Sequence, residues 1–135
     1  VVERALRHSH GLAGSLLVTD VFTHELDIRR ALGTAEPGCH PAMPTAFDVA
    51  IARIGATVGR LGMPALRFKT YGAWWVGGDG EPAVTVSTRP IELYDCLIGR
   101  SSPGQIRGLH WSDDPEPWLR VFSRVPLDPP EAAAW

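Results

Sequence analysis

The chain has 135 residues, enough for one ordinary domain, and 44% of them are hydrophobic, enough for a sizeable core. Its 13 basic and 15 acidic residues are interspersed and give a formal net charge of -2, so we expect no nucleic-acid partner and no anionic membrane surface. No apolar run approaches the length of a membrane span, no leader opens the chain, and Cys39 and Cys96 form no disulfide framework, so we expect a cytoplasmic protein.

The first predicted element is a helix over residues 12–32. From Ser15 onward the segment has no proline, and it ends at Gly33, which is typical of a helix with a left-handed C-cap. Residues 1–10 are predicted to form a helix end or turn before Gly11. Because the chain opens on Val1 without an initiator methionine, inside helix-like sequence, we expect it to be a piece of a longer protein.

Three polar residues of this helix, Asp20, His24 and Asp27, are spaced so that their side chains point to nearly the same side. An acid four residues before a histidine is often a surface pair that contributes about 0.2–0.5 kcal/mol. Apolar residues spread around much of the helix, which predicts that it is largely covered. A buried Asp–His pair needs a partner, and a metal ion is one candidate. The spacing alone leaves both interpretations open.

A proline-rich connection follows from Thr34 to Pro44, and we expect a domain boundary there. After it, Thr45 is a plausible N-cap for a second amphipathic helix that reaches Gly62. The sequence between residues 12 and 62 is therefore predicted to be two helices and a linker.

Beyond Gly62 the hydrophobic period changes to that of strands. Alternating or β-branched residues over 65–71, 74–76 and 83–88 are separated by glycine turns, which predicts two or three antiparallel strands. Pro90 then opens a third helix that stops at Gly99, residues 114–122 suit a capped terminal helix, and residues 126–135 read as a tail. This order predicts a small α+β domain in which helices cover one face of a sheet.

Two stretches of the sequence resemble the mycothiol-dependent maleylpyruvate isomerase family. They are DVFTHELDIRRALG, which begins at Asp20, and RPIELYDCLIGRSS, which begins at Arg89. Members of that family pair a DinB-like four-helix bundle, which carries a metal site, with a smaller domain similar to sterol carrier proteins. The resemblance implies an α+β fold in which residues 1–36 are the last helix of a truncated bundle. Residues 42–125 would then be the small domain, an antiparallel sheet covered by helices.

The same resemblance implies a chemistry. In the family a divalent metal, zinc, is held by an acid and by a histidine four residues later, which match Asp20 and His24, and by a further histidine on an earlier bundle helix. Asp20 stands where glutamate is usual, and the third ligand has no counterpart here. The metal would convert the thiol of mycothiol, the cosubstrate, to a thiolate for isomerisation or thiol transfer on a small-molecule substrate. We expect such catalysis in the complete parent protein and an incomplete metal site in this fragment.

For several residues the sequence supports two interpretations. Arg100 suits a charge at a helix C-terminus, and it also suits a catalytic contact with a substrate carboxylate, which the resemblance favours. Asp27 would orient a metal ligand or cap a neighbouring helix. Three tryptophans would line a pocket or belong to the core: Trp74, Trp75 and Trp111.

The rival function is a non-catalytic module that binds a small molecule or a lipid, and a third possibility is an inactive truncated protein. A single bundle helix would expose an apolar stripe around Leu17, Val21 and Ile28. Self-association through that face is therefore expected.

Overall fold

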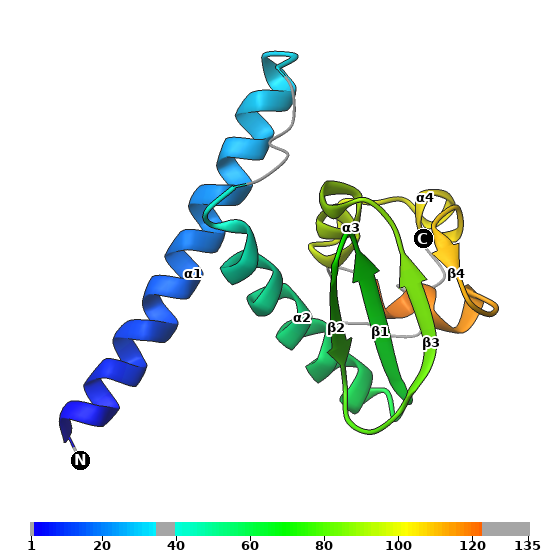
Figure 1. Ribbon diagram of the computed structural model, residues 1–135, viewed down its shortest axis with the longest axis horizontal. Coiled ribbons are helices and arrows are strands. Elements are labelled where there is room, and N and C mark those ends of the chain that lie inside the picture. The colour runs from blue at the N-terminus through cyan, green and yellow to red at the C-terminus, as the bar shows by residue number, and fades with distance from the viewer. Residues whose placement is uncertain (1, 35–39, 123–135) are drawn as a thin grey trace, which may run out of the picture. The chain divides into compact units, whose positions relative to one another are not determined.

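The computed structural model describes residues 2–34 and 40–122, with side chains from residue 14 onward, and it shows an α+β protein (Figure 1). The chain divides into two compact units, Val1–Val49 and Ala50–Trp135. Within the described ranges, no helix has both the length and the apolar character that crossing a bilayer requires. The expected tail, residues 126–135, lies outside these ranges.

The first unit is built on helix α1, Val2–Ala31. It ends as predicted at Gly33, whose φ of 67° is the left-handed conformation that favours glycine. The predicted break before Gly11 is wrong, because the helix runs through this residue. A glycine inside a helix costs only about 1 kcal/mol relative to alanine and does not force an end.

The prediction that α1 is largely covered is also wrong for its described side chains. Phe22 and Leu26 are fully buried, whereas several large apolar residues are exposed by 46–64% of their surface: Leu16, Leu17, Val21 and Ile28. The first unit buries Ala46 and Phe47 of the second helix, α2 (Met43–Arg60), as well. One side of α1 is therefore packed, and the expected apolar stripe is exposed.

Up to Phe122, the last described residue, the second unit contains the later part of α2, four strands and three further helical elements. Its elements after α2 are β1 (Ala65–Thr70), β2 (Ala73–Gly77), β3 (Pro82–Ser87), α3 (Pro90–Leu97), α4 (Pro103–Arg107), β4 (His110–Trp111) and the 3-10 helix η1 (Glu116–Phe122). The short helix α4 was not predicted; it starts at a capping box formed by Ser102 and Gln105.

The strands form one sheet in the order β2-β1-β3-β4. The pairing of β1 with β2 is antiparallel, as predicted, but β3 runs parallel to β1, so the expected antiparallel sheet is in fact mixed. The loop after β2 carries the chain past β1, and β3 pairs on its far side (Figure 1). Alternating hydrophobicity shows that a segment is a strand but not which strand it will pair with.

Helices cover one face of this sheet, as predicted (Figure 1). Phe68 and Val86, paired across β1 and β3, are fully buried on that face, and the Phe68 ring meets the Phe122 ring edge-on at 6.2 Å. The core residues around them come from α2, α3 and η1: Ile54, Val58, Leu93, Tyr94, Leu97, Trp118 and Val121. The next residues along the strands, Lys69 and Ser87, consequently point to the opposite face.

Gly78, in the turn after β2, gives a test of how tightly α2 packs on the sheet. Its φ is 98°, and a Cβ atom there would lie 2.9 Å from Val58 Cγ1 and 3.2 Å from Ala65 Cα. Gly80 has a φ of 86° but nothing within 4 Å of its would-be Cβ. Gly80→Ala should cost about 1–2 kcal/mol of unfolding free energy for the backbone alone. Gly78→Ala should cost about 1–3 kcal/mol more, because the added methyl group overpacks the core.

Urea unfolding followed by circular dichroism measures both variants. Equal losses of stability would show that the contact between Gly78 and Val58 is not tight.

Candidate functional site

Asp20 and His24 both lie exposed on α1. Neither makes a hydrogen bond or ion pair with a described residue. They share the exposed side of the helix with Leu17, Val21 and Ile28, while Asp27 is half-buried. Among the described residues, no three His, Cys, Asp or Glu side chains converge as a metal site would require. The structure thus offers two adjacent potential ligands, and their role in metal binding stays a prediction.

Arg100 is exposed just beyond the end of α3. Gly99 has a φ of 77°, and the backbone N–H of Arg100 donates to the carbonyl oxygen of Asp95 at 2.8 Å, which closes the helix. This position suits a cation near a helix C-terminus. The catalytic role predicted for Arg100 is untested.

The three tryptophans divide between the two faces of the sheet. Trp75 and Trp111 belong to the cross-strand row of Phe68 and Val86, and the Trp111 indole N–H donates to the carbonyl oxygen of Ile106 at 2.7 Å. Trp74 is 63% exposed on the other face, with the Arg67 guanidinium 5.5 Å above its ring. Trp75 and Trp111 are half-buried on the helix-covered face, which favours the core interpretation for these two.

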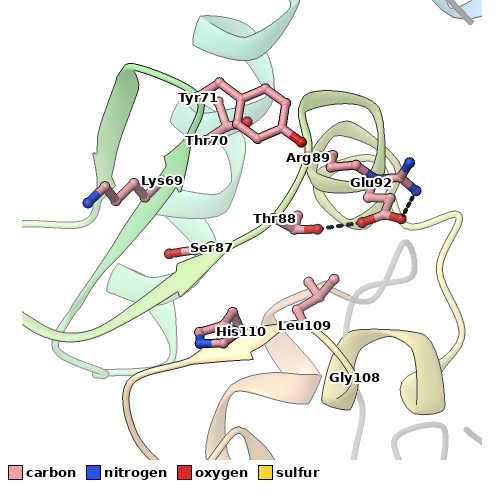
Figure 2. Close-up of a pocket in the computed structure, with 10 residues that line it drawn as sticks. All are labelled: Lys69, Thr70, Tyr71, Ser87, Thr88, Arg89, Glu92, Gly108, Leu109 and His110. Atoms are coloured by element: carbon pink, nitrogen blue, oxygen red, sulfur yellow. Dashed lines mark hydrogen bonds and ion pairs between the residues drawn. The ribbon is translucent and has the colours of Figure 1, made fainter.

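A cavity of about 540 Å³ lies in the second unit, at the carboxyl ends of β1 and β3 (Figure 2). Most of the residues that line it have polar side chains. The lining consists of Lys69, Thr70, Tyr71, Ser87, Thr88, Arg89, Glu92, Gly108, Leu109 and His110. Arg100 does not line this cavity. Open clefts at the carboxyl ends of strands are common places for ligand sites in α/β sheets. Sequence reasoning missed this site.

The sheet register positions one side of the cavity. Lys69 pairs with Ser87 across β1 and β3, and Ser87 pairs with His110 across β3 and β4, so the three residues form one row on the open face. The backbone N–H of Thr88 extends this ladder by donating to the carbonyl oxygen of Lys69 at 3.2 Å. Leu109 and His110 follow directly from the end of α4 into β4.

The other side of the cavity is an internally satisfied cluster at the start of α3 (Figure 2). Glu92 accepts a hydrogen bond from the Thr88 hydroxyl through one carboxylate oxygen, and it pairs with the Arg89 guanidinium through the other. The hydrogen bond from Arg89, and then that from Thr88, lowers the pKa of Glu92 below its ordinary value. Glu92 is therefore a carboxylate at neutral pH, with both oxygens engaged.

Polar groups on the remaining walls have no such partners among the described residues. These are the ammonium group of Lys69, the hydroxyl groups of Tyr71 and Ser87, and the imidazole of His110. Thr70 Oγ1 also lacks a hydrogen-bond partner, but it is buried on the helix-covered side of β1 and does not face the open space of the cavity.

A second polar cluster that the sequence did not reveal lies in the first unit. His40 accepts a hydrogen bond from the Ala42 backbone N–H at Nδ1 (3.0 Å), so its Nε2 carries the hydrogen and donates to Glu25 Oε2 at 2.6 Å. Arg29 donates to the other oxygen of Glu25 at 2.9 and 3.0 Å, and the Phe22 ring lies 5.1 Å from the His40 ring. Both oxygens of Glu25 are engaged, so this cluster ties α1 to the start of α2.

Cys96 is buried in α3, and its thiol donates to Ser101 Oγ at 3.2 Å. Burial raises the pKa of this thiol to about 11. Cys96 is therefore a neutral thiol at physiological pH and not an activated nucleophile.

Comparison with known proteins gives no relative from which to transfer a function. No protein-family model matches the chain, and no curated protein or solved structure matches it. The resemblance to the maleylpyruvate isomerase family accordingly stays a prediction.

Protonation of Glu25 should weaken the first unit. The hydrogen bonds from Arg29 and then His40 lower the pKa of Glu25 below 4.5, so its stabilisation is fully present above that pH and is lost as the pH falls through the lowered pKa. Glu25→Gln removes this contribution, so the free energy of unfolding should fall less steeply between neutral pH and about pH 3 than in the wild type.

The measurement is urea unfolding followed by the helical circular dichroism signal. The control is Glu81→Gln, an exposed residue that makes no ion pair with a described residue. An unchanged acid slope in Glu25→Gln would contradict the proposed contribution.

Proposed function

We propose that the second unit binds a small organic molecule in the cavity at the carboxyl ends of β1 and β3. The observation that carries this proposal is the cavity itself, because its volume of about 540 Å³ falls within the roughly 300–1,000 Å³ of small-molecule sites. Polar groups without a partner among the described residues line it, including those of Ser87 and His110. Such groups fix the orientation of a bound molecule through hydrogen bonds.

This function matches the binding-module alternative rather than the catalytic one. Cys96, the cysteine among the described residues, is a buried neutral thiol. The charged pair Arg89–Glu92 is internally satisfied. A sterol-carrier-like identity for this unit is part of the same proposal, and the helix-covered sheet is compatible with it.

Filling the cavity should abolish binding. Leu109→Trp puts a large ring at the cavity wall, whereas Leu32→Trp puts the same ring just after the end of α1, where Leu32 is 71% exposed. In a fragment screen by amide NMR, we expect wild type and Leu32→Trp to show ligand-dependent shifts at Ser87 and Thr88. Leu109→Trp should show none, because the ring occupies the space that the ligand needs. The proposal fails if no fragment moves these signals in the wild type.

We propose a second function for α1, favoured by the composition of its exposed side. Asp20 and His24 lie on this side among the exposed residues Leu17, Val21 and Ile28. In a helix bundle, an apolar face of this kind packs against the neighbouring helices. On this proposal, helices packed against this face complete a divalent metal site, with zinc as the metal. Mycothiol would be its thiol cosubstrate, as the resemblance implies. Self-association through the same face is one way of supplying those helices.

The described residues provide two ligands to such a site, whereas a catalytic zinc normally has three. Two ligands hold the ion weakly, because each lost ligand removes a large part of the binding free energy. Asp20 and His24 would serve as ligands, and Arg100 would serve as the contact with a substrate carboxylate. No proton or thiol transfer follows from these residues alone.

Zinc content tests the second function. In the protein at its natural length, His24→Ala should lower the affinity for zinc by at least about tenfold, and with it the zinc retained after dialysis, because losing a ligand costs more than losing a residue that only orients one. His110→Ala is the matched control, since His110 lies in the other unit, and it should leave the zinc content unchanged. Metal is measured by atomic emission spectroscopy, and equal zinc in wild type and His24→Ala removes His24 from any site.

A further inference from the structure

We infer that the ligand of the cavity carries an oxyanion, a carboxylate or phosphate group, and that Lys69 provides the positive charge that selects it. This inference rests on the proposed small-molecule function of the second unit and specifies its ligand class. It depends on one contrast in the cavity. The ammonium group of Lys69 has no partner among the described residues, whereas both carboxylate oxygens of Glu92 already accept hydrogen bonds.

The charged groups of the cavity give the first step. The one acidic residue of the lining, Glu92, has both carboxylate oxygens engaged by Thr88 and Arg89. A cationic ligand would have to displace one of these partners, which costs a charge-assisted hydrogen bond. The charge of Arg89 is balanced by that of Glu92, so the unbalanced charge of the lining is the positive charge of Lys69.

The geometry of the row gives the second step. Lys69, Ser87 and His110 are adjacent on three neighbouring strands and come from the same face of the sheet. In Figure 2 the Lys69 and Ser87 side chains extend from the sheet on the side away from Thr88, Arg89 and Glu92, and His110 lies next to Ser87. A lysine ammonium group has three donors and no acceptor, and hydroxyl groups can donate as well. Such a row complements a group that consists of acceptor oxygens.

The surroundings of Lys69 give the third step. No described residue forms an ion pair with its ammonium group, and its strand neighbour on the other side is Trp74, which carries no charge. The stem of Lys69 is long and flexible, so the ammonium group can swing toward an anion at Ser87. Oxyanion binding therefore needs no existing ion pair to break.

Three probes test the inference, and they differ in charge. Inorganic phosphate and succinate carry oxyanions, and dimethyl succinate is the uncharged counterpart of succinate. At constant ionic strength we expect phosphate or succinate to shift the amide NMR signals of Ser87, Thr88 and His110. Dimethyl succinate should not shift them.

Variants then test whether the positive charge that binds the oxyanion is that of Lys69. Lys69→Met should weaken the binding of the oxyanion by about tenfold, the usual cost of losing one hydrogen bond to a charged group. Lys69→Arg should restore most of the affinity. Arg53→Met removes one positive charge from the exposed surface of α2, away from the cavity, and should leave the affinity unchanged.

The outcomes separate this inference from the function on which it rests. If uncharged fragments bind at Ser87 and Thr88 but neither phosphate nor succinate does, the cavity is a small-molecule site and the oxyanion inference is overturned. Equal loss of affinity in Lys69→Met and Arg53→Met would overturn it too, because it would show a general effect of net charge. Absence of any binding at the cavity overturns both.

Discussion

The parallel pairing of β1 with β3 is the constraint from which the arrangement of the second unit follows. It brings Phe68 beside Val86 on the face that the helices cover, and in the next position it brings Lys69 beside Ser87 on the open face. It also makes both strands end at the same edge of the sheet. Tyr71 follows the end of β1 there, and the start of α3 follows the end of β3. The cavity lies at that edge, so a change in the register of β3 by one residue would bury Ser87 and expose Val86.

Features that depend on neighbouring residues could be predicted from the sequence. The helix ends at Gly33 and Gly99 were predicted because a glycine that adopts a positive φ is a local signal, and the start of α3 at Pro90 is another. The exposed apolar stripe on α1 was expected from the resemblance, because a single bundle helix lacks the partners that would cover it. The parallel partner of β3 and the two-residue strand β4 were not, because a pairing joins segments far apart in the chain and leaves no mark in either one.

The same distinction explains why the sequence pointed to α1 and not to the cavity. Asp20 and His24 are four residues apart on one helix, so their proximity can be read directly from the spacing. The row of Lys69, Ser87 and His110 spans 42 positions of the chain, and only the sheet brings its members together. The pair of Glu25 and His40 was missed for a similar reason, because a connection rich in proline gives no indication of which helical residue its histidine will meet.

The two proposed functions make different demands on the protein. Asp20 and His24 belong to the first unit and need further ligands, which the exposed apolar side of α1 is suited to recruit through packing with other helices. The cavity residues all belong to the second unit, and its unpaired donors need no additional protein group to hold an oxyanion. The ligand binding proposed for the second unit therefore does not depend on the metal binding proposed for α1. A protein with both functions would hold an anionic substrate through a group that is independent of the metal.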